Sequence, residues 1–391
     1  MRWFSLRFPR AYRLKPVAAK GEDSLSLLTI GADRQGVLVP YSLGLDYIVA
    51  SRGVGSLPIQ SFDFRIEPLG LLPALWTRLS LKFFVKERKY LKYREFFLQS
   101  AGPKAERKRF TRHNRDPLSI GLMDSDLVRS HPELLYGWKE DERVPLATAS
   151  TAATTVAVVA HIFYEDTWPD IAGALRCLTN PFDLIVTTVA GRDRLTETIR
   201  RSYPQAEIEV VENRGRDVGP FLTLLERGRL DRYRYICKVH GKKSIDGDRK
   251  ALIGAMWRRR LLFDLLAAPG AASAAIDTFE RDPSIGMIGP KSFRLPNEWY
   301  SEDLSWSANR SMTLEIAERM GVPPEKFRLD FFGGTMFWVR PEALRPLRDL
   351  HLAADMPEES GLVDGDLPHA LERLFATSVL AAGYRLAESG E

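Results

Sequence analysis

The residues most suited to chemistry stand at the end of a short apolar run near the middle of the chain. In "YRYICKVHGKKS" (233–244), the cationic candidates are Lys238, His240, Lys242 and Lys243. Period-two alternation along a strand places Lys238 and His240 on one side. Fixed ammonium and imidazole groups can stabilise negative charge on a departing diphosphate, a task that other sites give to a metal ion. A solvated basic loop has the same composition, so this segment alone does not distinguish a diphosphate-binding site from an exposed loop.

A second cationic segment, "ENRGRDVGPF" (212–221), lies between an apolar run and a helical pattern. Arg214 and Arg216 carry forked guanidinium groups that suit phosphate or carboxylate. Gly215 permits a tight turn, and Asn213 can bridge backbone groups within it. Asp217 either caps the following helix or accepts a hydrogen bond from a sugar or ribose hydroxyl. A well-capped surface turn is the alternative.

Two later segments offer backbone access and carboxylates. In "LDFFGGTMFWVRPEAL" (329–344), Gly333 and Gly334 let the backbone close on a ligand, and Thr335 offers a hydroxyl. The segment then reads as a strand that ends at Arg340, followed by a helix. These features predict that residues 333–335 line a binding site.

The segment "GLVDGDLPHALERLF" (361–375) predicts a turn followed by a helix. His369 and Glu372 are three residues apart and therefore neighbours on one helix face. Asp364 and Asp366 precede the helix, where its N-terminus favours carboxylates. A general base with a supporting network is one interpretation, and helix capping with a surface His–Glu pair is the other.

Alternating elements from residue 156 onward would bring these segments together. The pattern predicts strands at 156–164, 182–190, 206–213 and 233–240, with helices at 168–178, 194–204 and 219–228. This order predicts an α/β fold with a mostly parallel sheet and right-handed crossovers. Such sheets bind ligands beyond the carboxyl ends of their strands, where His161 and Tyr164 also lie.

Composition and charge narrow the class of protein. The chain has 391 residues, and its net charge of +5 divides into about +12 over residues 1–120 and about −7 over the rest. Two cysteines exclude a disulfide framework, and no apolar run reaches transmembrane length. The opening residues lack the apolar core of a secretory leader. A cytoplasmic, reducing setting is expected, with anionic lipid or nucleic acid as partners on charge alone.

The domain boundary is expected near the small-residue stretch "ATASTAATT" (147–155), which divides the chain into residues 1–150 and 151–391. The first part reads as a smaller basic region of mixed β and helix. Residues 71–98 have aromatic side chains at helical spacings and five basic side chains on another side. We expect an amphipathic helix that either packs on its own domain or docks on an anionic membrane surface.

The ordered set of motifs resembles the rhamnan synthesis protein F family of bacterial polysaccharide glycosyltransferases. The motifs are "VAVVAHIFYEDTW", "NRGRDVGPFL", "YICKVHGKKS", "WRRRLLFDLL", "IGMIGPKSF", "FFGGTMFWVRPEAL" and "DGDLPHALERLF". They span residues 156 to about 385. One departure is that Asp366 stands where the family tends to have Thr.

The resemblance implies a fold similar to the GT-A type and transfer of a sugar, often a 6-deoxyhexose such as rhamnose, from a nucleotide donor to a cell-surface glycan. "KVHGKKS" stands where such folds hold a metal-binding Asp-x-Asp, which predicts a metal-independent reaction. "VDGD" stands where many inverting enzymes hold the catalytic carboxylate. We therefore expect Asp364 as the general base, with His369 and Glu372 as the second choice or as its supporting network.

The predicted substrates are a dTDP- or GDP-deoxyhexose and a lipid-linked glycan at the inner face of the bacterial plasma membrane, with other assembly enzymes as partners and no cofactor. The predicted donor site comprises His161, Tyr164, Asn213, Arg214, Gly215, Arg216, Asp217, Lys238, His240, Lys242, Lys243, Gly333, Gly334 and Thr335. A noncatalytic or sugar-binding scaffold of an assembly complex would keep the fold and lose the base. A glycoside hydrolase would need two carboxylates and no diphosphate clamp. A nucleic-acid-binding protein is suggested by the basic first third alone, which carries no recognised binding motif.

Overall fold

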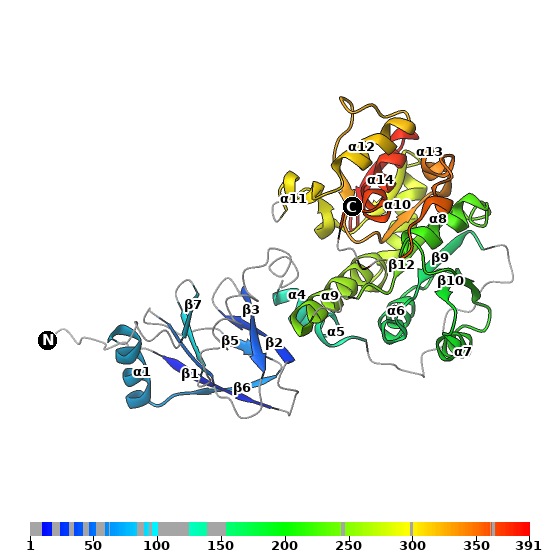
Figure 1. The fold of residues 1–391 in the computed structure, drawn as a ribbon. Helices are drawn as coiled ribbons and strands as arrows, with labels where there is room; N and C mark the ends of the chain where they lie inside the picture. Colours follow the sequence, from blue (N-terminus) through cyan, green and yellow to red (C-terminus); the bar gives the residue numbers. More distant parts are fainter. Residues whose placement is uncertain are drawn as a thin grey trace. The chain divides into compact units, whose positions relative to one another are not determined.

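The chain forms two compact units, which are described separately (Figure 1). The computed structural model describes residues 10–17, 24–30, 35–41, 47–51, 59–61, 63–83, 90–93, 96–100, 125–138, 154–243, 247–297, 300–359, 361 and 364–391. One unit comprises Met1–Pro132 with Ser244–Ile253, and the other comprises Glu133–Lys243 with Gly254–Glu391. The boundary expected at residue 150 lies outside the described residues.

The N-terminal unit is built from two antiparallel sheets, with strand orders β6-β1-β4-β8-β7 and β3-β2-β5. Its elements are β1 (Ala11–Pro16), β2 (Ser24–Ile30), β3 (Gln35–Tyr41), β4 (Tyr47–Ser51), β5 (Ile59–Ser61), β6 (Phe64–Pro68), α1 (Leu71–Phe83), β7 (Tyr90–Tyr93), β8 (Phe96–Ser100) and α4 (Ser125–Ser130). Leu14 and Tyr47 from the first sheet and Leu28 and Val37 from the second belong to one buried core. The prediction of a mixed β and helical region is therefore confirmed.

The helix predicted over residues 71–98 is wrong beyond Phe83. Helix α1 ends there, and β7 and β8 form an antiparallel pair farther along. Phe96 and Leu98 in β8 are buried in the shared core. Aromatic side chains favour strands as well as helical stripes, and pairing of β8 with β4 satisfies its backbone groups. The aromatic spacing therefore fitted a helix only by coincidence.

The second unit contains a seven-stranded sheet with the order β11-β10-β9-β12-β16-β13-β17. Its strands are β9 (Val156–His161), β10 (Asp183–Val189), β11 (Glu207–Val211), β12 (Tyr235–His240), β13 (Ile285–Gly289), β16 (Phe337–Val339) and β17 (Arg385–Glu388). Strands β9 to β12 are parallel, β13 and β17 are parallel, and β16 runs antiparallel to β12 and β13. The predicted α/β class and mostly parallel sheet are confirmed.

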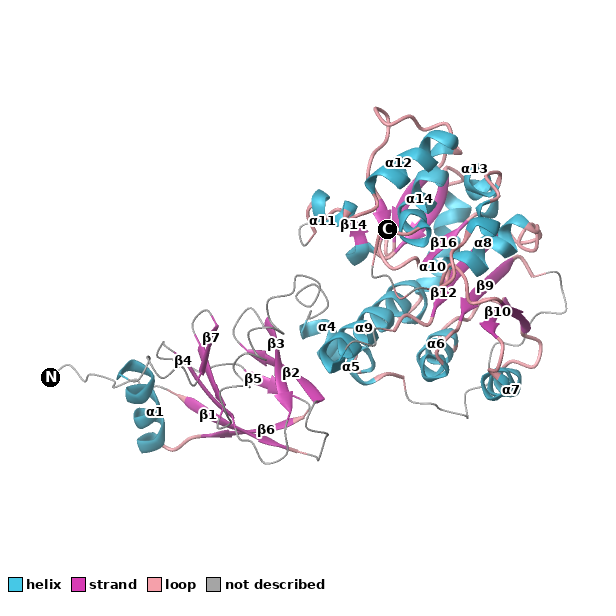
Figure 2. Cartoon of the chain, in the orientation of Figure 1, coloured by secondary structure: helices cyan, strands magenta, loops and turns pink. Residues whose placement is uncertain are grey.

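Helices cover both faces of this sheet (Figure 2). The helices and turns are α5 (Glu133–Tyr136), η2 (Glu165–Thr167), α6 (Trp168–Leu175), α7 (Asp193–Ser202), α8 (Val218–Glu226), α9 (Gly247–Leu262), η3 (Phe263–Ala267), α10 (Ala271–Arg281), η4 (Lys291–Phe293), α11 (Glu302–Trp306), α12 (Arg310–Arg319), η5 (Pro341–Leu344), α13 (Arg345–Arg348), η6 (Leu352–Asp355) and α14 (Leu367–Ala381). On one face, Phe221 of α8 and Phe375 of α14 pack against Phe337 of β16. On the other, Phe279 of α10 stacks on Tyr235 of β12.

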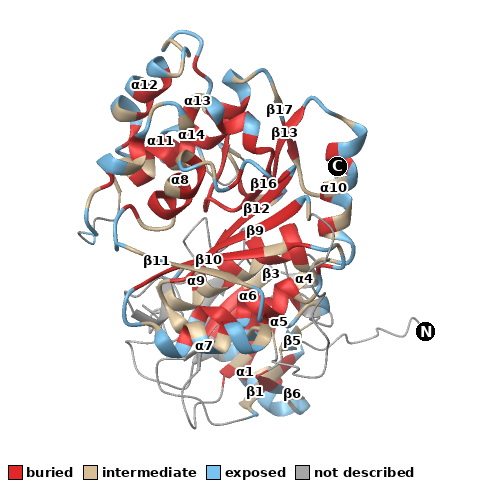
Figure 3. Cartoon of the chain, turned by 90° about the vertical axis from the view of Figure 1, so that its right-hand side faces the viewer, coloured by how far each residue is buried: buried red, intermediate tan, exposed pale blue. Residues whose placement is uncertain are grey.

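The central strands are buried along their length, as their near-continuous apolar sequences predict (Figure 3). The late strand β16 lies directly beside β12, with Lys238 opposite Phe337. A short strand β15 (Phe331–Phe332), which pairs with β14 (Arg294–Leu295), precedes it. The turn between β15 and β16 contains Gly333, Gly334 and Thr335. This turn is thereby delivered to the carboxyl end of β12.

No single described helix is long and apolar enough to cross a membrane. The bent pair Ala251–Ala267 and Ala271–Arg281 meets those criteria only when its two helices are taken together.

Candidate active site

The candidate site lies at the carboxyl ends of β9 and β12, where these strand ends meet two further segments, the turn with Thr335 and the residues after β11. His161 and His240 end these two strands and are paired in register. The turn that contains Thr335 reaches the same edge, because Thr335 lies 3.3 Å from Nε2 of His240. Asp217, which follows β11, hydrogen bonds to Thr335. The expected convergence of strand-end residues is therefore present.

Lys238 is the centre of a buried polar cluster. Its side chain is only 2% exposed, and its Nζ donates to Oδ2 of Asp217 at 2.6 Å and to the carbonyl of Thr335 at 2.8 Å. The Thr335 hydroxyl donates to the same Asp217 oxygen at 2.6 Å. Burial raises the pKa of Asp217, but the charge of Lys238 and the hydrogen bonds from Lys238 and Thr335 outweigh that effect and hold the pKa well below its usual range. The Lys238–Asp217 pair is therefore charged and serves as an internal support.

Three aromatic rings complete the surroundings of this ammonium group. The centroids of Phe221, Phe337 and Phe375 lie 5.5, 5.9 and 5.9 Å from Nζ of Lys238. Cation–π contacts of this kind stabilise a cation that has lost its water shell. The Lys238 ammonium is therefore enclosed by protein groups near the carboxyl end of β12.

The two histidines at the strand ends are neutral at pH 7. Burial lowers the pKa of His240 to about 3 and that of His161 to about 4. Nε2 of His240 donates to the carbonyl of Gly334 at 2.8 Å, and Nδ1 of His161 lies 3.0 Å from the Thr187 hydroxyl. Both imidazoles therefore contribute hydrogen bonds, and His240 does not supply the positive charge that its position in a basic loop suggested.

Lys242 and Lys243 have different surroundings although they are neighbours. Lys243 pairs with Asp166 on η2 and lies over the ring of Tyr164 at 5.2 Å. The Lys242 ammonium lies 4.0 Å from the centroid of Trp257, and across the described ranges no carboxylate comes within ion-pair distance of it. Burial lowers the pKa of Lys242, whereas the more distant charges of Glu372 and Asp217 raise it. Lys242 is therefore a partly buried cation that has no anionic contact among the residues that the structure describes.

The loop that carries Lys242 is fixed from both sides. Gly241 donates to the His161 carbonyl at 2.9 Å, and a Cβ at this position would lie 2.2 Å from Oγ1 of Thr167. Nη1 of Arg258, on α9, donates to the Lys242 carbonyl. The same guanidinium pairs with buried Asp170 on α6. These contacts hold the backbone of Lys242 in place.

The turn after β11 points its two arginines in different directions. Arg214 donates through Nε to the carbonyl of Met356 at 3.0 Å, so it fastens the turn to the segment before α14. Gly215 and Arg216 both have left-handed backbone conformations, with φ of 67° and 56°. This geometry is free for glycine and costly for arginine, so the fold holds Arg216 in place. Asn213 is exposed.

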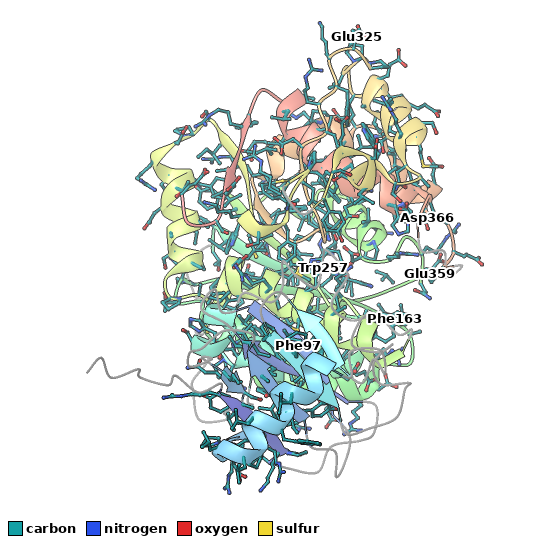
Figure 4. The ribbon with its side chains drawn as sticks, turned by 90° about the vertical axis from the view of Figure 1, so that its left-hand side faces the viewer. Phe97, Phe163, Trp257, Glu325, Glu359 and Asp366 are labelled. Carbon is teal, nitrogen blue, oxygen red and sulfur yellow. The ribbon has the colours of Figure 1, made fainter. Side chains whose placement is uncertain are left out.

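Arg216 reaches the N-terminus of α14. Its Nε lies 3.2 Å from Oε2 of Glu359, and its Nη2 lies 3.9 Å from Oδ2 of Asp366. Figure 4 labels Glu359 and Asp366, the two residues whose carboxylates contact this guanidinium. Nη1 of Arg216 lies 2.8 Å from Nε2 of His369, whose Nδ1 contacts Oδ1 of Asp366. These groups form a second polar cluster.

Asp364 and Glu372 are both engaged with backbone groups. Asp364 accepts from the amide of Ala308 at 3.0 Å and from Nδ2 of Asn309 at 2.6 Å. Burial raises its pKa, but hydrogen bonds from Ser307, Ala308 and Asn309 outweigh burial and lower the pKa to about 2. Glu372 accepts from the Gly334 amide at 2.6 Å. Asp364 thus anchors the start of α12, and Glu372 holds the Gly333–Thr335 turn.

Comparison with known proteins assigns the chain to a family. The family described as Rhamnan synthesis protein F matches residues 84–384. The chain belongs to the rhamnan synthesis protein F family. This confirms the resemblance seen in the motifs.

Two curated relatives of this rhamnan synthesis F protein are the uncharacterized proteins WxcX from two strains of Xanthomonas campestris pv. campestris. Each is 34% identical over 258 residues, which cover 64% of this chain and 36% of the relative. The chain therefore spans about a third of the length of the relatives that it matches. A solved structure, Staphylococcus aureus TarS residues 1–349, is similar at 13% identity and a TM-score of 0.33, covering 61% of this chain and 59% of TarS.

The predicted site residues of this rhamnan synthesis F protein form two clusters with a periphery. The first cluster comprises His161, Asp217, Lys238, His240, Lys242, Gly334, Thr335 and Glu372, and the second comprises Arg216, Asp366 and His369. Tyr164, Asn213, Arg214 and Lys243 lie around them, and Asp364 faces the loop before α12. Among the residues that can be described, no three His, Cys, Asp or Glu side chains are grouped to hold a metal ion.

Sequence reasoning missed the residues that fix the loop of Lys242. These residues lie on helices and not at the end of a strand in the sequence: Trp257 and Arg258 are on α9, Asp170 is on α6 and Thr167 is on η2. The motif "WRRRLLFDLL" contains two of them, but its helical pattern gives no sign of which side chain faces the sheet. The three consecutive arginines at 258–260 are the one feature of this sequence that could have indicated the residues that fix the Lys242 loop.

Proposed function

We propose that the protein is a glycosyltransferase that moves a sugar, a 6-deoxyhexose such as rhamnose, from a nucleotide donor to a growing cell-surface polysaccharide. Membership of the rhamnan synthesis protein F family supports the class of reaction. The mostly parallel sheet, with polar clusters at its carboxyl edge, is the layout expected of a GT-A-like nucleotide-binding domain. A dTDP- or GDP-linked sugar is the proposed donor.

The observation that carries this proposal is that, among the described residues, no carboxylate lies within ion-pair distance of the Lys242 ammonium. A desolvated cation is costly unless an anion compensates it. Lys238 and Lys243 each contact an aspartate, whereas within the described part of the chain the Lys242 ammonium contacts the face of Trp257 and no carboxylate. Arg258 donates to the Lys242 carbonyl and so holds the backbone of this residue next to the end of β12. We infer that the diphosphate of the donor is the missing anion.

Arg216 is the proposed second contact to the diphosphate. It is half-buried and lies close enough to Lys242 for their charges to interact. A guanidinium fork can bind two phosphate oxygens at once. Glu359 and Asp366 balance its charge in the absence of a donor. We assign Tyr164 and Asn213, at the periphery, to the nucleoside, with His161 supporting that side from behind.

We propose that these cations replace a divalent ion. The carboxylates near the strand end are already committed: Asp217 accepts from Lys238 and Thr335, and Glu372 accepts from the Gly334 amide. A metal ion on Asp217 would have to displace Lys238. The arrangement of donors and acceptors therefore fits a diphosphate bound by fixed cations better than one bound through a metal.

The proposed reaction is a single displacement at the anomeric carbon. An acceptor hydroxyl forms the new carbon–oxygen bond while the bond to the diphosphate oxygen breaks. The electron pair of that bond leaves with the nucleoside diphosphate, whose charge Lys242 and Arg216 stabilise. The hydroxyl proton passes to a general base, and the anomeric configuration inverts.

We propose His369 as the general base, in place of our first expectation, Asp364. Both oxygens of Asp364 accept hydrogen bonds and its pKa is lowered to about 2, so it is a weak proton acceptor. Nε2 of His369 carries a lone pair, since it faces a guanidinium that can only donate. Oδ1 of Asp366 contacts the opposite ring nitrogen, Nδ1. When Arg216 turns to the diphosphate, Nε2 becomes free to accept the proton.

Thermal shift with a panel of nucleotide sugars tests the binding half of the proposal. We expect one donor to raise the melting temperature with and without EDTA, and the Lys242→Ala variant to lose most of that shift. The proposal fails if no nucleotide sugar shifts the wild-type protein, or if the shift requires magnesium or manganese.

Release of nucleoside diphosphate tests the catalytic half and separates the enzyme from a noncatalytic scaffold. The donor that binds is incubated with and without a lipid-linked glycan acceptor. We expect release that depends on the acceptor. Binding of donor with no release under either condition would favour the scaffold.

We place this reaction at the inner face of the bacterial plasma membrane, where a lipid-linked glycan would be the acceptor and other polysaccharide assembly enzymes would be partners. The basic first part of the chain supports a peripheral position at an anionic surface.

A further inference from the structure

Among the side chains of helix α1 that the structure describes, two small ones are buried and four large apolar ones are exposed. Ala74 and Thr77 are 3% and 7% exposed, and Ala74 packs with Ala11 of β1 and Ala50 of β4. In contrast, Leu72 is 77% exposed and Trp76 is 69% exposed. A helix packed on a sheet normally turns its large apolar residues inward. The orientation of α1 is the reverse.

The exposed residues form one continuous surface. Leu72, Trp76 and Leu79 are four and three residues apart, so they lie on the same side of the helix. Leu71 extends that side at the N-terminus, and Leu71 and Leu79 are both about half exposed. We call these four residues the outward face of α1. Contiguous apolar surface of this kind marks an interaction site.

We propose that the outward face of α1 docks on an anionic membrane surface. The tryptophan at its centre has an apolar body and a polar N–H, the combination that settles at the boundary between headgroups and acyl chains. The helix sequence, LLPALWTRLSLKF, contains Arg78 and Lys82 and no acidic residue. Apolar insertion and attraction to anionic lipid would therefore act together.

Charge separates a membrane from the main alternative, a second copy of the chain. Residues 1–120 contain 22 Lys and Arg against 10 Asp and Glu. Two copies that met through α1 would bring two basic units together and repel each other. An anionic bilayer has the opposite charge, so it attracts the basic side chains that lie near its surface.

The test is sedimentation of the full chain with vesicles. One set contains phosphatidylcholine alone, and the other also contains phosphatidylglycerol. We expect the wild-type protein to pellet with the anionic vesicles and to be released by added salt. The Leu72→Ser/Trp76→Ser double variant should bind at least tenfold more weakly. Both side chains are exposed, so its melting temperature should match that of the wild type.

Val210→Ser/Leu304→Ser is the matched control. It replaces two exposed apolar residues in the second unit, at 62% and 56% exposure, and should pellet like the wild type. Equal pelleting of the α1 variant would overturn the proposal. So would a lipid-free dimer, seen by analytical ultracentrifugation, that the α1 double variant dissociates. No nucleotide sugar is present, so neither result depends on the proposed glycosyl transfer.

Discussion

Nη1 of Arg216 lies 2.8 Å from Nε2 of His369, although the two residues are 153 positions apart in the chain. A guanidinium is always protonated and has no acceptor, so the imidazole nitrogen must accept. The proton of the neutral ring is therefore on Nδ1, which contacts Asp366. One residue proposed to bind the diphosphate thus covers the nitrogen proposed to take the proton. Our proposal therefore couples donor binding to exposure of the base through this contact.

The first prediction concerns this pair. His369→Gln should lower kcat by about 10²–10⁴ because the amide cannot take a proton, whereas the Kd for the nucleoside diphosphate should change by less than about threefold. Steady-state kinetics and calorimetric titration measure the two quantities. Asp364→Asn is the comparison and should retain more activity. Full turnover by His369→Gln, or a larger loss in a folded Asp364→Asn protein, would return the role of base to Asp364.

The second prediction separates two adjacent lysines. Lys242→Ala should weaken binding of the nucleoside diphosphate by roughly 10–100-fold, which is the range expected for hydrogen bonds to a charged group. Lys243→Ala is the matched control and should change the Kd by a factor of about three or less, because Lys243 is paired with Asp166 near the surface. Equal effects of the two substitutions would contradict the assignment of Lys242.

The third prediction concerns the buried Lys238–Asp217 pair. Lys238→Met leaves the Asp217 carboxylate buried without its cation and should lower the free energy of unfolding by about 3–5 kcal/mol. The Asp217→Asn/Lys238→Met double variant removes both charges and should cost less than Lys238→Met alone. Urea denaturation at pH 7 measures both. If the free energy of unfolding of Lys238→Met lies within about 1 kcal/mol of the wild-type value, the Lys238–Asp217 ion pair is not formed in solution.

The fourth prediction is a loss of stability between pH 6.5 and pH 4. The pKa values of His161 and His240 fall from 6.5 to about 4 and about 3 on folding. In this window the unfolded chain binds more protons than the folded one, so the free energy of unfolding decreases as the pH falls. Each histidine contributes up to about 1.4 kcal/mol per pH unit. Well above pH 6.5 neither the folded nor the unfolded chain binds these protons, so the two histidines no longer make the free energy of unfolding depend on pH.

Urea denaturation at pH 7, 6 and 5 measures this slope. His161→Asn removes one titrating ring while keeping a partner for the Thr187 hydroxyl, so its slope should be shallower than that of the wild type. Asp217 and Lys238 face His161, and Lys242 also faces His240. The pKa of Asp217 is held well below its usual range, so its carboxylate stays charged between pH 6.5 and pH 4. An unchanged slope in His161→Asn would be inconsistent with a buried, neutral ring.

The fifth prediction tests how the Lys242 loop is held. Gly241→Ala places a methyl group against Oγ1 of Thr167 and should cost about 1–3 kcal/mol of stability. Adding Thr167→Ala removes that oxygen, so the double variant should be more stable than the sum of the two single effects predicts. Thermal unfolding of the four proteins measures the coupling. Additive effects would place Gly241 away from Thr167.

Local sequence pattern predicted the sheet well because each element has its own period. The near-continuous apolar runs of β9, β10 and β12 and the helical repeats of α6 to α8 required no knowledge of distant residues. Residues 71–98 failed because aromatic side chains at helical spacing also suit paired strands. The choice there depended on β4, which lies far away in sequence.

The sequence pattern predicted which segments meet at the site, but it did not predict which groups each side chain contacts there. Alternation placed Lys238 and His240 on one side of β12, and both contact Thr335. It could not show that Lys238 would be sealed behind Phe337 and Phe375, because those rings come from later elements. Lys242 and Lys243 looked alike in sequence. The aspartate that distinguishes them belongs to η2, nearly eighty positions earlier.

The position of β16 between β12 and β13 has a consequence for how the protein is made. Strand β12 ends at His240 and its neighbour begins at Phe337, so a ribosome adding about 5–20 residues per second completes the neighbour many seconds later. During that interval the nascent sheet has an open edge and Lys238 lacks two of its rings. Chaperones that shield unpaired strands would bind this open edge of β12. A chain whose synthesis stops before β16 would keep the open edge and would be degraded by proteases.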